Sequence, residues 1–95
     1  MATPILFVIR GDPGGLAAFE RVLRRRYDAD YRVVAESSTE AGLATLRQLA
    51  ARGEEVALVL ADQWLPGMAG DEFLVRARAL HPLARRAPRA PARGS

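Results

Sequence analysis

Residues 56–70 read VALVLADQWLPGMAG, and this stretch determines how the rest of the chain is interpreted. Its first six residues are apolar, which is typical of a strand buried on both faces of a parallel sheet. Asp62 follows directly, where such a strand leaves its sheet. Pro66 and Gly67 predict a sharp turn, and Gly70 allows a close backbone approach before the next helix.

Two further strand-and-helix units precede this stretch. The apolar run 5–9 predicts another buried strand. Asp12 and Pro13 then favour a helix start, and apolar residues at three- and four-residue spacing extend this helix over about residues 13–27. Residues 31–36 are less uniformly apolar, which predicts a strand at the edge of the sheet.

The remaining helices have recognisable ends. Ser37 and Glu40 have the spacing of a capping box, so the second helix is expected to begin after Ser37 and to close near Gly53. The third helix is expected to place Asp71 in its first turn and to stop at His81, which precedes a proline. This alternation of strands and helices predicts an α/β fold with a parallel sheet and right-handed crossovers.

Charge is distributed unevenly along the chain. All 14 basic residues are arginine, and four of them lie in residues 85–95, which contain no acid. This composition predicts that residues 1–84 form the folded part and that residues 85–95 are a disordered basic tail. A basic tail can also bind nucleic acid or acidic surfaces, although a solvated, disordered end explains the composition better.

Composition narrows the class of protein. The chain has no cysteine, which excludes disulfides and thiolate metal sites. No apolar run approaches the roughly 18–20 residues of a membrane span. The apolar run near the N-terminus is also too short for a signal-peptide core. A cytoplasmic protein with no membrane partner is therefore expected.

The stretch from Val59 to Gly70 resembles the receiver (CheY-like) domain of bacterial two-component response regulators. The family pattern is an Asp at a strand end, followed by Pro-Gly-Met and a Gly two residues later. The resemblance covers about residues 4–84 and includes Asp12 and the second helix. It implies a doubly wound, flavodoxin-like three-layer sandwich with strand order 2-1-3, truncated after the third helix.

The resemblance also implies a role in phosphorelay signal transduction. Asp62 would be the phosphoacceptor that takes a phosphoryl group from a histidine kinase, and the chain itself would not be an enzyme. Members of the family hold Mg²⁺ with this Asp, with an acidic pair after the first strand, and with a backbone carbonyl two residues past the Asp. The carbonyl would here belong to Trp64.

The acidic pair is replaced in this sequence. Aligned on Asp12 and Pro13, the two positions hold Arg10 and Gly11. Asp12 is then a weak candidate metal ligand, and a helix cap explains it better. The Arg10 guanidinium either pairs with Asp62, standing where the metal charge belongs, or turns outward into solvent. Asp62 itself could simply accept backbone N–H bonds within its loop.

Other expected elements are absent from the sequence. The family's fourth strand ends in Ser or Thr and its fifth in Lys, and this chain contains no Lys. A missing fourth strand would leave the outer edge of the strand 56–61 bare, which predicts self-association. Two alternatives therefore stand beside the phosphoacceptor: a degenerate pseudo-receiver that acts as a protein-interaction module without phosphorylation, and a non-functional truncated fragment. Binding of nucleic acid by the tail is a distant further alternative.

Overall fold

The computed structural model describes residues 3–89, which form one parallel sheet, a short hairpin and three helices. The elements, in chain order, are β1 (Ile5–Ile9), α1 (Pro13–Tyr27), β2 (Arg32–Glu36), α2 (Thr39–Ala51), β3 (Val56–Asp62), β4 (Trp64–Leu65), β5 (Met68–Ala69), α3 (Gly70–Leu80) and β6 (Arg85–Arg89). The predicted strands and helices before residue 81 are all present, with bounds within one or two residues of those expected.

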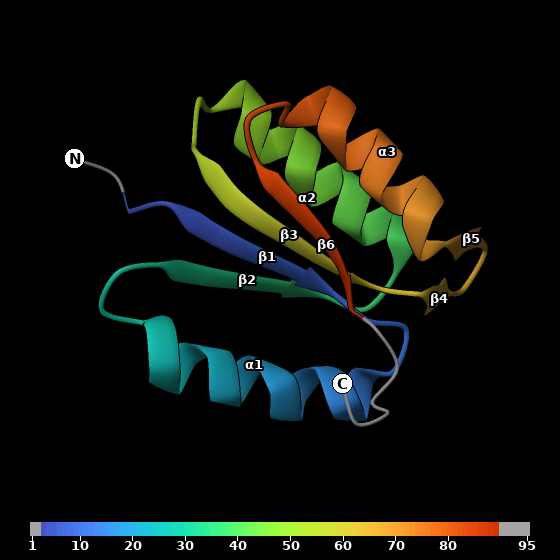
Figure 1. Ribbon diagram of the computed structural model, residues 1–95, viewed down its shortest axis with the longest axis horizontal. Coiled ribbons are helices and arrows are strands. Elements are labelled where there is room, and N and C mark those ends of the chain that lie inside the picture. The colour runs from blue at the N-terminus through green and yellow to red at the C-terminus, as the bar shows by residue number, and fades with distance from the viewer. Residues whose placement is uncertain (1–2, 90–95) are drawn as a thin grey trace.

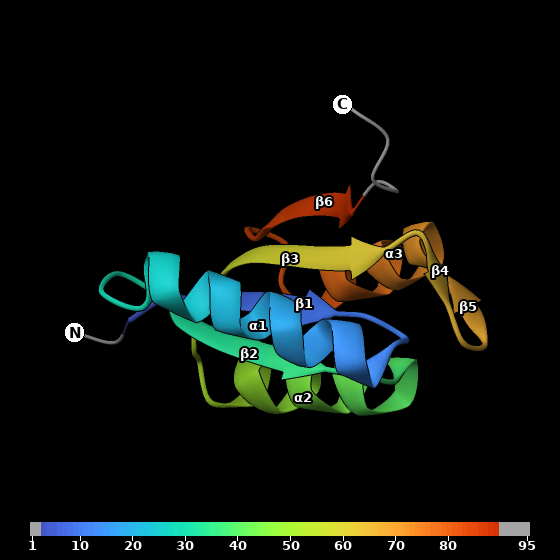
Figure 2. The same cartoon turned by 90° about the horizontal axis from the view of Figure 1, so that it is seen from below.

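The sheet is parallel throughout, and its strand order is β2-β1-β3-β6. α1 covers one face, whereas α2 and α3 lie side by side on the other (Figures 1 and 2). The predicted three-layer α/β sandwich and the order 2-1-3 are therefore confirmed. β2 lies at an edge of this sheet, as its mixed composition predicted.

Alternate side chains of β1 enter two separate cores, one on each face of the sheet. Leu6 and Val8 pack beneath α1, together with Leu16 and Leu23 of that helix. The odd-numbered residues of β1 pack beneath α2 and α3, where the Phe7 ring stacks on Phe73 with centroids 6.3 Å apart. Both faces of β1 are thus buried, which explains its uninterrupted apolar sequence.

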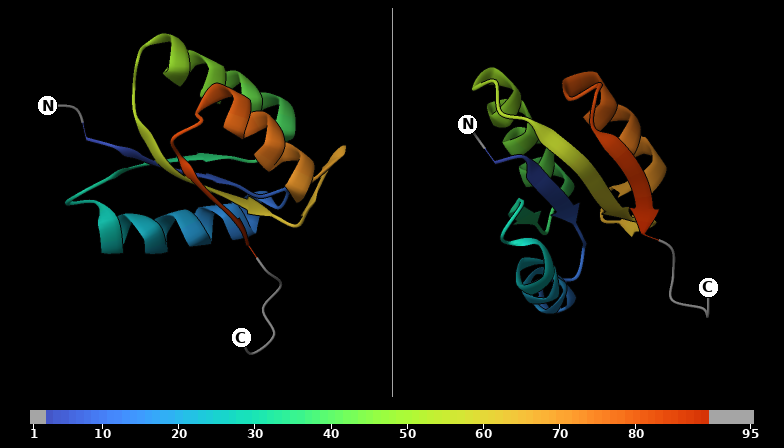
Figure 3. Two further views of the ribbon diagram at one scale, coloured as in Figure 1. Left: turned by 45° about the horizontal axis from the view of Figure 1, so that its top comes forward. Right: turned by 60° about the vertical axis from the view of Figure 1, so that its left-hand side comes forward.

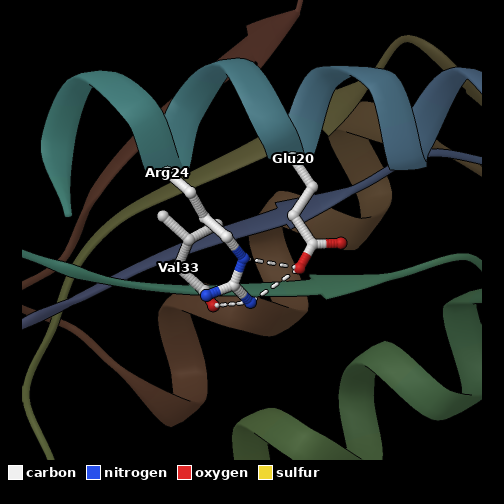
Figure 4. A network of polar contacts seen from close by, with 3 residues as sticks. All are labelled: Glu20, Arg24 and Val33. Carbon is white, nitrogen blue, oxygen red and sulfur yellow. Dashed lines mark hydrogen bonds and ion pairs between the residues drawn. The ribbon is translucent and has the colours of Figure 1, made fainter.

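Arg24 fastens α1 to the edge of the sheet. Its Nε and Nη2 donate to Glu20 Oε2 at 2.9 and 2.6 Å, and Nη2 also donates to the Val33 carbonyl at 3.0 Å (Figure 4). Glu20 lies one turn before Arg24 on the same helix, so the pair holds the guanidinium over β2. Arg24 therefore links α1 to β2 through hydrogen bonds to both.

The start of α2 differs by one residue from the prediction. Ser38, and not Ser37, is the N-cap, and its hydroxyl accepts a hydrogen bond from the Ala41 N–H at 3.1 Å. Both serines precede the helix, so spacing to Glu40 alone did not identify which one adopts the capping conformation. The predicted end is confirmed, because Gly53 follows the helix with φ of +71°.

β6 corrects the expectation of a disordered tail over residues 85–95. Residues 85–89 form a strand paired in parallel with β3 from Leu58 to Asp62, and Figure 3 shows it alongside that strand. Residues 90–95 lie outside the described residues. The strand β6 forms because a bare edge of β3 would leave a row of backbone groups without hydrogen bonds, and β6 provides their partners.

Two expectations change with β6. The chain does not stop after the third helix, because a strand occupies the fourth position of the sheet. The outer edge of β3 is covered, which removes the basis for the predicted self-association. The segment was not predicted as a strand because its composition is biased and lacks an apolar pattern. It includes Pro88, which is tolerated in an edge strand, where one side of the backbone needs no partner.

The helices in residues 3–89 are amphipathic and short. α1 is the longest at 15 residues, whereas a membrane span needs about 20. No helix in this part of the chain is long and apolar enough to cross a membrane.

Candidate functional site at the carboxyl ends of the strands

The carboxyl ends of the central strands bring Arg10 and Asp62 together. In the sheet, Ile9 of β1 is the partner of Ala61 of β3, and Ile9 is also the partner of Glu36 of β2. Arg10 and Asp62 are the next residues along their strands, so the register places them side by side. This edge of a parallel sheet is where ligands bind in open α/β folds.

Arg10 forms an ion pair with Asp62. The distance from Arg10 Nε to Asp62 Oδ2 is 3.1 Å, and the two side chains are 20% and 17% exposed. The first of the two alternatives for Arg10 is therefore confirmed, and the outward orientation is wrong. A charge-assisted hydrogen bond between partly buried groups is stronger than a neutral one, because water competes less for both partners.

Gly15 provides the space for the Arg10 guanidinium. A Cβ atom on Gly15 would lie 3.2 Å from both Cζ and Nη2 of Arg10, and 2.7 Å from Asp12 Oδ2. Any side chain at Gly15 would therefore displace these two neighbours. A glycine inside a predicted helix is itself a sequence signal for such a role. It lowers helix stability by about 0.5–1 kcal/mol relative to alanine, so its presence requires a reason.

Asp12 occupies the predicted N-cap position of α1 without capping through its side chain. Its backbone is extended, and its carbonyl accepts a hydrogen bond from the Leu16 N–H at 2.8 Å. Its carboxylate makes no hydrogen bond to the N-terminal N–H groups of the helix, so the predicted side-chain cap is wrong. The carboxylate lies instead over Gly15, beside Arg10.

The turn after Asp62 is a small hairpin formed by β4 and β5, with Gly67 at its tip in the left-handed region (φ +79°). The Gly70 N–H donates to the Gln63 carbonyl at 2.9 Å. A Cβ on Gly70 would overlap the carbonyl oxygen of Asp62, so the close approach predicted for Gly70 is confirmed. The hairpin therefore holds the backbone of Asp62 tightly against the start of α3.

Pro66 of the hairpin contacts two neighbouring segments, the loop after β1 and the start of α2. A Cβ on Gly11 would lie 2.5 Å from Pro66 Cδ, so the loop after β1 packs directly on this proline. Thr39 Oγ1 at the start of α2 donates to the Pro66 carbonyl at 3.3 Å. Gly11, which replaces an acid of the family pattern, thus allows the two loops that flank Asp62 to meet.

The residues around Asp62 do not fit Mg²⁺. This ion requires a nearly octahedral shell of hard oxygen ligands. In residues 3–89, no group of three or more His, Asp or Glu side chains could hold a metal ion. The backbone of Trp64 belongs to β4, and the Asp12 carboxylate lies over Gly15, close to the Arg10 guanidinium. A cationic side chain, Arg10, binds the carboxylate that would have to be the principal ligand.

His81 has a structural role that its sequence position did not reveal. Its side chain is buried, and its Nε2 lies 2.8 Å from the Leu46 carbonyl. Because a carbonyl oxygen only accepts, Nε2 must carry the proton. The bond joins the end of α3 to α2 and lies away from Asp62, which agrees with the absence of a metal or triad pattern around this histidine in the sequence.

A cavity of about 570 Å³ opens on the α1 face of the sheet, and it does not reach Asp62. Its wall includes Leu58 and Leu60 of β3, Leu23 of α1, and Arg85. Leu83 also lines it and is 98% exposed. The candidate site and this cavity are therefore separate features of the molecule.

The fold is shared with solved structures of receiver domains. A CheY-like response regulator receiver domain protein from Methanospirillum hungatei JF-1 matches with a TM-score of 0.74 and 24% sequence identity, over 92% of this chain and 63% of its own. A response regulator protein from Burkholderia pseudomallei, solved with a phosphorylated aspartic acid, a calcium ion and citrate, matches with a TM-score of 0.72 and 20% identity, over 90% of this chain and 45% of its own.

The receiver domain from the hybrid histidine kinase CckA matches with a TM-score of 0.68 and 18% identity, over 93% of this chain and 87% of its own. No family model matches the chain, and a search of curated proteins finds no match. The chain spans about three fifths of the Methanospirillum protein and less than half of the Burkholderia protein. These likenesses establish a CheY-like receiver fold.

Proposed function

We propose that this chain is a receiver-type module of a phosphorelay and that Asp62 is its phosphoacceptor for a histidine kinase. The observation that carries the proposal is the position of Asp62, at the carboxyl end of β3 with a side chain that is 17% exposed. The Burkholderia response regulator with the same fold contains a phosphorylated aspartic acid, which supports this assignment.

The chemistry assigned to Asp62 is a single displacement. A carboxylate oxygen of Asp62 attacks the phosphorus, a new P–O bond forms, and the bond from phosphorus to the donor nitrogen or oxygen breaks. The donor leaves with that electron pair and takes a proton from water. In this proposal the chain is the acceptor, and no residue of it is assigned as a catalytic acid or base.

Arg10 is the group that could lower the electrostatic cost of this step. A carboxylate and a phosphoryl group repel each other, and a fixed positive charge beside the reacting oxygens offsets that repulsion. Arg10 lies at the right place, because its Nε is 3.1 Å from Asp62 Oδ2. Its guanidinium also has further N–H groups with which to donate to phosphoryl oxygens.

The same ion pair supports a second candidate function, a protein-interaction module that works without phosphorylation. Arg10 holds Asp62 in a charge-assisted hydrogen bond, and this bond must be loosened before the carboxylate can attack. In such a module the pair would fix the shape of the loops that flank Asp62. Binding of a partner would then require the ion pair and no phosphoryl group on Asp62.

Treatment with a small phosphodonor separates the two functions. The protein is incubated with phosphoramidate or acetyl phosphate, with and without Mg²⁺, and its intact mass is measured. The phosphoacceptor proposal predicts the addition of one phosphoryl group that hydroxylamine removes, and none in Asp62→Asn. Asp12→Asn is the matched control and should still be modified. An unmodified wild-type protein under both conditions would overturn the proposal.

A further inference from the structure

We propose that Arg10 replaces the divalent cation at Asp62, so that the crevice binds no Mg²⁺ in the wild-type protein and becomes a cation site when Arg10 is removed. The inference concerns the same crevice as the proposed function. It does not depend on phosphorylation of Asp62, because it concerns only the positive charge of Arg10 beside the unmodified carboxylate.

The position of Arg10 is fixed by the backbone as well as by its charge. The Arg10 N–H donates to the Glu36 carbonyl at 3.2 Å, which continues the pairing of β1 with β2 beyond Ile9. From the end of β1 the side chain extends to Asp62 at the end of the neighbouring strand β3. The guanidinium is therefore held at the carboxylate by the register of three strands.

The Arg10 guanidinium occupies the position beside Asp62 Oδ2 where an ion bound to that oxygen would lie. Asp62 Oδ2 contacts Nε on one side, and the space over Gly15 is occupied by Cζ, Nη2 and the Asp12 carboxylate. A divalent ion at Asp62 would also lie close to a positive charge. Two positive charges about 4 Å apart repel by roughly 4 kcal/mol per unit charge pair at the effective dielectric of a protein surface.

Removal of Arg10 would make the local charge of the crevice more negative. With Arg10 present, the formal charges of Arg10, Asp12 and Asp62, three described side chains of the crevice, sum to −1. Without it, two carboxylates remain beside the vacated space, because Asp62 touches the guanidinium on one side and Asp12 borders it over Gly15. Two carboxylates, loop carbonyls and water are the ligands with which Mg²⁺ is usually held.

Calorimetric titration with MgCl₂, and in parallel with MnCl₂, tests the proposal on four proteins: wild type, Arg10→Ser, Arg10→Lys and Arg10→Ser/Asp62→Asn. The wild type and Arg10→Lys should show no saturable binding at millimolar metal. Arg10→Ser should bind at least about tenfold more tightly than either, since the local charge becomes more negative by one unit. The double variant should lose that gain.

Saturable binding of Mg²⁺ to the wild-type protein, lost in Asp62→Asn, would overturn the proposal. So would a folded Arg10→Ser that binds no more tightly than the wild type. Circular dichroism establishes that each variant is folded, and Arg10→Gln, which keeps most of the side-chain volume, takes the place of Arg10→Ser if that protein is not. A failure of the phosphodonor experiment would leave these titrations unaffected, so the two proposals fail separately.

Discussion

Arg10 Nε lies 3.1 Å from Asp62 Oδ2, although 52 positions separate the two residues in the chain. The pair joins the carboxyl ends of β1 and β3 at one edge of the parallel sheet. The carboxylate that we propose as a phosphoacceptor therefore has a positive charge beside it. This relationship is the basis of both proposals above.

Removal of the Ser38 hydroxyl should destabilise the start of α2. Ser38→Ala loses the hydrogen bond to the Ala41 N–H, and loss of an N-cap typically costs about 1 kcal/mol. Ser37→Ala is the matched control and should change the free energy of unfolding by less than about 0.5 kcal/mol. Urea unfolding measures both. Equal losses for the two serines would contradict the assignment of Ser38 as the cap.

Gly70→Ala should be strongly destabilising, because the new Cβ would overlap the carbonyl oxygen of Asp62 and the backbone there cannot move aside cheaply. We expect a loss of at least about 2 kcal/mol in the free energy of unfolding. Gly14→Ala is the control. Its Cβ would meet only Asp12 Oδ1 at 3.7 Å, so alanine should stabilise α1 by about 0.5–1 kcal/mol. A tolerated Gly70→Ala would show that the hairpin is not held so closely.

Deletion of β6 should expose the edge of β3. A chain that ends at Ala84 loses the backbone hydrogen bonds to residues 58–62, each of which contributes about 0.5–1.5 kcal/mol. It should be less stable by a few kcal/mol and should self-associate in sedimentation velocity, as unpaired strand edges do. A chain that ends at Arg89 keeps every described strand and is the control. Equal stability of the two chains would mean that β6 contributes nothing.

His81 should contribute stability through its bond to the Leu46 carbonyl. His81→Leu keeps an apolar group of similar size at a site that is 8% exposed, but it loses the donor, so we expect a loss of about 1–2 kcal/mol. His81→Gln places an N–H donor near the position of Nε2 and should lose less. Thermal unfolding of the three proteins provides the comparison, and a larger loss for His81→Gln would contradict the role of the donor.

The elements before residue 81 could be predicted because their signals are local. β1 is apolar on both faces, α1 has regular apolar spacing, and Gly53 marks the end of α2 by its conformation. Strand order followed from the family resemblance, and the turn at Gly67 and Gly70 followed from its glycines. In each case the residues themselves carry the physical cause of the structure.

The features that were missed depend on neighbours far away in the sequence. β6 has little apolar character, and it forms because β3 offers an unpaired edge. His81 is buried because its helix ends over the Leu46 carbonyl. The orientation of Arg10 could not be decided from the sequence, because it depends on the register of β1 with β3 and on the space over Gly15.

A double-mutant cycle on Arg10 and Asp62 tests the central claim, that these two side chains interact in the folded protein. The free energy of unfolding is measured for wild type, Arg10→Ala, Asp62→Ala and the double variant. Partial burial of the pair predicts a coupling energy of about 1 kcal/mol.

The exposed pair of Arg76 and Glu72 on α3 serves as the reference, with side chains 56% and 53% exposed and an expected coupling of about 0.3–0.5 kcal/mol. Coupling between Arg10 and Asp62 that clearly exceeds this reference is the predicted result. Additive effects of Arg10→Ala and Asp62→Ala, with a coupling energy near zero, would contradict the account.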